Sequence, residues 1–199
     1  MSLVLTKNHI KNKIMLVMGV EKGTVIDLET TGLPDQKEHE IVCVGYITSN
    51  KLIILCRRSE DKKPFYTELK RLVKRLPKPF YAYNAQFERT IIEKELGLAF
   101  PLNSFVDLMK PWKVKAVLHG LKWPRLSELI SEPQQYFEDR VVSGGDVPKL
   151  WKNYLRTGSQ KNLTLIMQHN LSDLLREAIL LLLHPEFYTK KVTKQSREA

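Results

Sequence analysis

The sequence lacks a long hydrophobic run, and it contains very few cysteines. The longest apolar run, residues 178–183, is far shorter than the roughly 20 residues of a membrane-spanning helix, so we expect no membrane partner. No small-residue cleavage site of a signal peptide follows the apolar residues 14–20, and we therefore expect a cytoplasmic protein. Cys43 and Cys56 are too few for a disulfide framework, and we expect free thiols buried in two core strands.

Negative charge is scarce relative to positive charge. The chain has 22 Asp and Glu against 32 Lys and Arg, which gives a net charge of +10. Each Lys or Arg that neutralises a phosphate releases a condensed counterion, so this excess favours a nucleic-acid partner, although basic proteins of other kinds share it. With 199 residues, 43% of them hydrophobic, the chain is long enough for one well-buried domain. We place this domain at 23–185, after an unassigned arm or edge strand at 1–22 and before a basic tail at 186–199.

The pattern of apolar residues predicts an α/β fold. Apolar and β-branched runs predict strands at 24–30, 41–47, 52–55, 80–83 and 104–108. Helical periodicity or N-terminal signals predict helices at about 63–76, 85–97, 113–118, 126–130, 148–155 and 162–183. The short connection at 48–50 predicts a hairpin. This order of elements matches a mixed central sheet of about five strands flanked by helices.

Two acids interrupt the first of these predicted strands. Because strand side chains alternate, Asp27 and Glu29 point to one face while Ile26 and Leu28 point to the other. Like charges at that spacing repel, and burying either without a partner is costly, so the pair favours a bound cation. Carboxylate oxygens are the ligands that Mg²⁺ and Mn²⁺ prefer. The alternative for a bare Asp-x-Glu is a solvated strand end with two unrelated acids.

Further acids are needed if these two hold metal ions, because two side chains cannot fill two octahedral shells. Glu88 follows a predicted strand-to-helix junction; alternatively it is an exposed acid at a helix start, favoured by the helix dipole. His169 and Asp173 are one turn apart on a predicted helix, so they share a face. A histidine near its normal pKa of about 6.5 is well suited to taking a proton from water. Such a pair can equally be a hydrogen bond at the surface.

Three strings together resemble a known family of nucleases. Residues 27–33 read Asp-x-Glu-Thr-Thr-Gly-Leu, residues 83–88 read Tyr-Asn-Ala-Gln-Phe-Glu, and residues 169–173 read His-Asn-Leu-Ser-Asp. The first string resembles the first exonuclease motif of the DnaQ-like (DEDD) 3′-to-5′ exonucleases, which have an RNase H-like fold. The second has Glu where that group has Asp. The third, with three residues between His and Asp, is closest to the YprB-type predicted exonucleases, a likeness that spans most of 24–184.

The resemblance implies a function and a set of site residues. It implies a 3′-to-5′ exonuclease that hydrolyses single-stranded DNA to nucleoside 5′-monophosphates with two Mg²⁺ or Mn²⁺ ions. The implied metal ligands are Asp27, Glu29, Glu88 and Asp173, and His169 is the implied general base. The implied substrate-binding residues are Thr30, Leu33 and Asn84. The alternatives are a 3′-to-5′ exoribonuclease and a catalytically silent nucleic-acid-binding module, and the sequence leaves the oligomeric state open.

Overall fold

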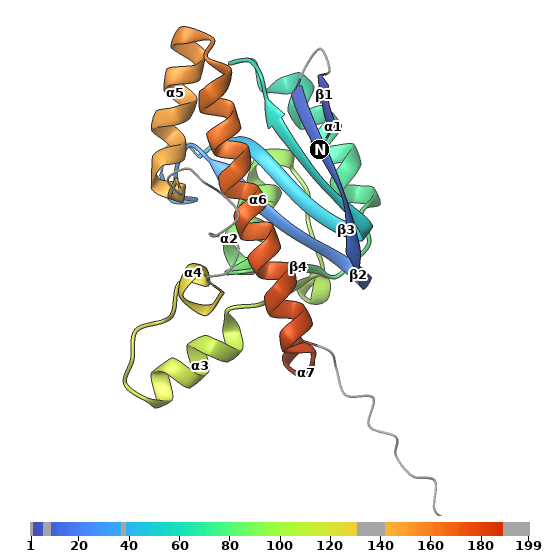
Figure 1. The fold of residues 1–199 in the computed structure, drawn as a ribbon, viewed down its shortest axis with the longest axis vertical. Helices are drawn as coiled ribbons and strands as arrows, with labels where there is room; N and C mark the ends of the chain where they lie inside the picture. The colour runs from blue at the N-terminus through green and yellow to red at the C-terminus, as the bar shows by residue number, and fades with distance from the viewer. Residues whose placement is uncertain (1, 6–8, 37–38, 131–141, 189–199) are drawn as a thin grey trace, which may run out of the picture.

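The chain folds around one mixed β-sheet with helices on both faces (Figure 1). The computed structural model describes residues 2–5, 9–36, 39–130 and 142–188. The strands are β1 (Ser2–Leu5), β2 (His9–Thr30), β3 (Ile41–Arg57), β4 (Phe80–Ala82) and β5 (Phe105–Asp107). β2 pairs antiparallel with β1 and β3 and parallel with β4, which pairs parallel with β5. The predicted α/β fold with a mixed sheet of five strands is therefore confirmed.

β3 folds back on itself. The Cα atoms of Cys43 and Cys56 are 4.2 Å apart, although an extended segment of 13 residues would span roughly 43 Å. Ser49 has a left-handed φ of 51°, as a tight turn requires, so the predicted hairpin at 48–50 is confirmed. The hairpin brings the two cysteines opposite each other, and the structure joins them in a disulfide bond. The expectation of free thiols is therefore wrong. Cys43 and Cys56 are 13 residues apart in the sequence, but the hairpin makes them cross-strand neighbours.

The helices agree with most of the sequence-based assignments. They are α1 (Lys63–Arg75), α2 (Ala85–Leu96), α3 (Lys110–Leu118), α4 (Leu126–Leu129), α5 (Val147–Thr157), α6 (Gln160–Leu183) and α7 (Pro185–Tyr188), with 3₁₀ turns η1 (Leu102–Ser104) and η3 (Gly144–Asp146). The predicted arm at 1–22 contains β1 and the first part of β2. The predicted tail begins inside α7, and residues 189–199 lie outside the described residues. None of the helices in the described ranges is long and apolar enough to cross a membrane.

The alternation along β2 divides the core into two halves. Ile26 and Leu28 pack on one face of the sheet with apolar residues of α1 and α2. Val25 packs on the other face with residues of α5 and α6, and α6 crosses this face in the foreground of Figure 1. Asp27 and Glu29 have the same parity as Val25 and therefore point toward α6. The strand thus delivers both acids to the sheet face that α6 covers.

Candidate functional site

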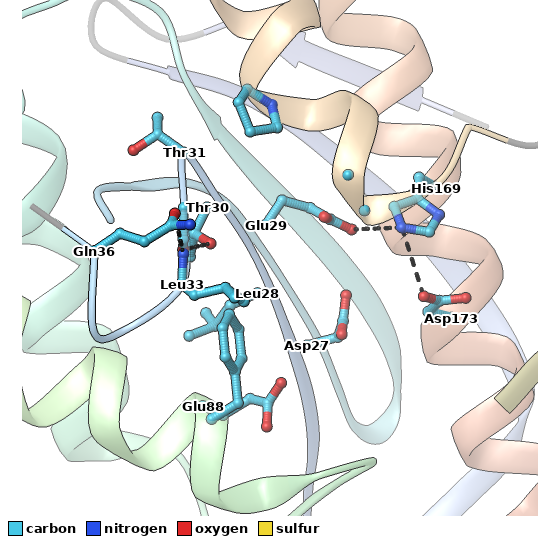
Figure 2. Close-up of a pocket in the computed structure, with 15 residues that line it drawn as sticks. Asp27, Leu28, Glu29, Thr30, Thr31, Leu33, Gln36, Glu88, His169 and Asp173 are labelled. Atoms are coloured by element: carbon cyan, nitrogen blue, oxygen red, sulfur yellow. Dashed lines mark hydrogen bonds and ion pairs between the residues drawn. The ribbon is translucent and has the colours of Figure 1, made fainter. Parts of the chain in front are cut away.

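A cleft of about 490 Å³ lies where the second half of β2 ends (Figure 2). Its walls come from β2 and the turn after it, the start of α2, the glycines of η3 and the middle of α6. Every acid singled out from the sequence lines it, together with the histidine: Asp27, Glu29, Glu88, His169 and Asp173. Segments far apart in the chain therefore bring these five side chains to one cavity.

His169 lies between two of the carboxylates. Its Nε2 is 3.8 Å from Glu29 Oε1 and 3.7 Å from Asp173 Oδ2, as the dashed lines in Figure 2 show. Burial lowers the pKa of the imidazole below its usual 6.5, although the Asp173 charge opposes this. The ring is therefore neutral near pH 7, and Nε2 faces the cavity. A neutral imidazole in that position can accept a proton.

Asn170 connects α6 directly to β2. Its Nδ2 donates one hydrogen bond to Asp27 Oδ2 at 2.6 Å and another to the backbone carbonyl of Asp27 at 3.1 Å. This close approach requires Gly45, which is the β3 residue paired with Asp27. A Cβ on Gly45 would overlap Asn170 Oδ1 and Leu174 Cδ1. Neither residue was predicted from the sequence to belong to the site, although a glycine inside an apolar strand is a recognised sign of close packing.

Arg176 holds Asp173 from the far side of the cleft. The guanidinium is almost fully buried, donates from Nη1 to Asp173 Oδ1 at 2.7 Å, and donates from Nε to the Ile130 carbonyl at 3.1 Å. The bond leaves Oδ2 of Asp173 turned toward His169. Arg176 was also missed, and its position one turn after Asp173 was the available signal.

A fifth acid, Glu177, lies beneath the cleft and was missed by the sequence analysis. It is only 1% exposed, and its Oε1 accepts a hydrogen bond from the Tyr83 backbone N–H at 2.6 Å. Glu177 therefore ties α6 to the junction that leads into α2 and Glu88. Within the described part of the chain, Oε2 of Glu177 and Oε2 of Glu88 are both buried without a hydrogen-bond donor. The spacing of one helical turn from Asp173 could have indicated Glu177.

The buried carboxylates raise one another's pKa values. Burial raises the pKa of Asp27, Glu29, Glu88 and Glu177 well above their usual values. Neighbouring negative charge raises them further, mainly that of Asp173 on Asp27 and that of Asp27 on the other three. Desolvated oxygens without donors and close like charges are the conditions that a bound cation relieves.

A divalent cation fits this donor set by its chemistry. The donors are hard carboxylate oxygens, which suit Mg²⁺ or Mn²⁺, and one of them, Oε2 of Glu88, has no hydrogen-bond donor in the described ranges. As the side chains stand, no group of three or more Asp, Glu, His or Cys residues among the described residues is arranged to hold one ion. Binding would therefore require these side chains to rearrange.

The three predicted substrate-binding residues differ in position. Thr30 lines the cleft, and its hydroxyl donates to the Gly32 carbonyl at 2.7 Å. Leu33 lines the mouth of the cleft with an exposed side chain, held by a hydrogen bond from its N–H to Gln36 Oε1. Asn84 does not line the cleft; it is exposed, has a left-handed φ of 69°, and donates its N–H to Asp107 Oδ1. The structure thus brings Thr30 and Leu33, but not Asn84, to the acids.

Comparison with known proteins identifies the family. A family model described as RNase_H superfamily matches residues 24–182, which include every residue that lines the cleft. The comparison with curated proteins gave no match. Members of the matched superfamily are typically nucleases that use divalent metal ions, in agreement with the acidic cleft. The chain therefore belongs to the RNase H superfamily.

Proposed function

We propose that this protein is a metal-dependent 3′-to-5′ exonuclease of the DnaQ-like group, closest to the YprB type, acting on single-stranded DNA. One observation supports the proposal above all: Asp27 and Glu29 on β2, Glu88 on α2, and His169 and Asp173 on α6 line a single cleft. Four acids and one neutral histidine suit hydrolysis of a phosphodiester better than simple binding, because simple binding of phosphate would favour cations in the cleft.

The metal ligands would be Asp27, Glu29, Glu88 and Asp173. When bound, two Mg²⁺ or Mn²⁺ ions would supply Lewis-acid stabilisation of the charge that develops on the attacked phosphate and lower the pKa of the attacking water. Asn170 orients the Asp27 carboxylate and Arg176 orients that of Asp173 through their hydrogen bonds.

The remaining steps involve other residues of the cleft. His169 accepts the proton of the attacking water at Nε2, the nitrogen that faces Glu29 and Asp173. The backbone at Thr30 contacts the terminal 3′ hydroxyl, and Leu33 packs beneath the terminal base. The exposed position of Leu33 at the mouth of the cleft suits contact with an unpaired base. The reaction releases a nucleoside 5′-monophosphate.

A digestion ladder tests the proposal. Oligonucleotides of DNA and RNA of equal length, labelled at the 5′ end, are incubated with the full chain and Mg²⁺ or Mn²⁺. The expected result is a ladder shortening from the 3′ end, nucleoside 5′-monophosphate as product, and no ladder with Asp27→Asn. RNA shortened much faster than DNA would replace the proposal with a 3′-to-5′ exoribonuclease, and internal cleavage would refute an exonuclease.

A nucleic-acid-binding module without turnover is the second candidate. It is favoured by one observation, namely that no three acidic, histidine or cysteine side chains of the described residues are spaced to hold an ion. Titration of Mn²⁺ into the protein, followed by calorimetry, separates the two candidates. Binding that is lost in Asp27→Asn supports the nuclease, whereas absence of binding together with retained oligonucleotide affinity supports the silent module.

A further inference from the structure

The segment at 109–125, which we call the α3 arm, extends away from the sheet, and Trp112 packs against the core cluster on the α6 side. It contains α3 and the loop that leads to α4, and in Figure 1 α3 lies at the lower left, away from the sheet. Large apolar side chains are exposed along it, including Leu118 at 77%, Leu121 at 65% and Trp123 at 49%. Exposed apolar surface of this extent indicates a binding site.

The charge of the α3 arm has one sign. Residues 108–127 contain no Asp or Glu. The same stretch holds five side chains that carry a positive charge, namely Lys110, Lys113, Lys115, Lys122 and Arg125. A docking protein with an apolar surface would not require this charge, whereas a phosphate backbone would.

Aromatic rings and lysines are interleaved on this surface. Lys113 Nζ lies 3.5 Å from the centre of the Trp123 ring, and Lys115 Nζ lies 5.0 Å from that of Trp112 and 4.7 Å from that of Phe187. Aromatic faces beside cations are the combination that single-stranded nucleic acid uses, because bases stack on the rings and phosphates pair with the cations.

The α3 arm is fixed to the molecule at both ends. At its start, Trp112 Nε1 donates to the Tyr188 hydroxyl at 3.2 Å, and that hydroxyl donates to the Leu108 carbonyl at 2.8 Å. At its end, the Tyr83 hydroxyl donates to the Pro124 carbonyl at 2.6 Å. Tyr83 opens the segment that leads to Glu88, so the arm joins the body of the protein next to the acidic cleft.

We infer that the α3 arm binds the part of a single-stranded nucleic acid that extends beyond the nucleotides held in the cleft. The inference rests on the proposed function in taking nucleic acid as the substrate. The lysines pair with phosphates, and Trp123 and the exposed leucines contact bases. The cleft, which is acidic, positions the end of the strand, and the arm supplies the affinity for its length.

Binding without hydrolysis tests the inference. Fluorescence anisotropy with a labelled 20-nucleotide single strand, in the presence of a chelator, measures affinity at several salt concentrations. The arm variant carries Lys113→Gln, Lys115→Gln and Lys122→Gln. The control carries Lys63→Gln, Arg71→Gln and Lys74→Gln on the exposed face of α1, which removes the same charge.

The arm variant is expected to lose about tenfold or more in affinity at low salt. The slope of log K against log salt should become shallower by about 2, since each single-strand phosphate contact contributes about 0.7. The control should change much less. Wild-type protein that does not bind, an arm variant that binds as well as wild type, or an equal loss in the control would each overturn the inference.

Trp123 gives a test that does not depend on charge. Trp123→Ala should weaken binding about fivefold or more, and Trp123→Phe, which keeps a stacking ring, should retain most of the affinity. An alanine variant with unchanged affinity would contradict stacking on this ring. Failure of the proposed function would give a different result. A protein that binds single strands through the α3 arm but hydrolyses none of them would refute the proposed nuclease activity and leave the inference about the α3 arm standing.

Discussion

Gly45→Ala should damage both the stability and the activity of the protein, because the added methyl group has no room. It would overlap Asn170 Oδ1 and Leu174 Cδ1, both on α6, which packs directly against this point of β3. Overpacking of a buried site costs about 1–3 kcal/mol. Alanine recovers about 0.4–1 kcal/mol by restricting the unfolded chain. At the middle of both ranges the net loss is about 1.3 kcal/mol, which corresponds to a fall of roughly 3–5 °C in Tm for a chain of this size.

The same substitution should reach the cleft. Asn170 can make room only by moving, and movement breaks its 2.6 Å hydrogen bond to Asp27 Oδ2. Displacement of the Asp27 carboxylate, a proposed metal ligand, by about 1 Å is expected to lower kcat by about 10². Thermal unfolding followed by circular dichroism measures the first effect, and the rate of the 3′-end ladder measures the second.

Two controls make the result decisive. Gly145→Ala, where the nearest atom to the added methyl is 3.6 Å away, should leave Tm nearly unchanged. In an Asn170→Ala background, Gly45→Ala should cost at least about 0.5 kcal/mol less, because one of the two overlaps is gone. A Gly45→Ala protein with wild-type Tm and rate, or an equal cost in both backgrounds, would refute the packing described for α6 and β3.

Three further predictions concern the cleft and the buried Glu177 beneath it. Removal of divalent ions by a chelator should abolish hydrolysis and added Mg²⁺ or Mn²⁺ should restore it, whereas activity that persists under chelation would rule out a metal-dependent reaction. His169→Ala should lower the rate by about 10² to 10⁴, and a smaller loss of rate would make His169 a structural residue. The wild-type rate should rise with pH through a pKa below 6.5, because burial lowers the pKa of this imidazole. Burial raises the pKa of Glu177 above its unfolded value of about 4.3, so its ionisation costs stability that grows as pH rises from there toward the folded-state pKa. Glu177→Gln can still accept a hydrogen bond from the Tyr83 N–H. In chelator, urea unfolding should therefore show this variant to be more stable than wild type at pH 8 and similar to wild type at pH 4. Equal stability of the two proteins at both pH values would contradict a buried charge on Glu177.

Local patterns were sufficient for most of the helices and strands after residue 23 and for two of the acids in the cleft. Alternation along β2 placed Asp27 and Glu29 on the face opposite Ile26 and Leu28, and the two faces indeed belong to different core clusters. The helical repeat of α1 and its end near Arg75 are equally local properties. Such features depend on side-chain period and on breakers such as Pro77, so the sequence carries them without help from tertiary contacts.

The sequence by itself determined the identity of the acids, the fold class and the likeness to RNase H-type nucleases. Only the tertiary structure decided which side chains support those acids: Gly45 and Asn170 behind Asp27, Arg176 behind Asp173, and Glu177 beneath the cleft. It also joined Cys43 to Cys56 and left Asn84 outside the cleft. The physical reason is that close packing and hydrogen bonding join residues far apart in the chain, such as Asn170 and Asp27, and no local period encodes which distant segments will meet.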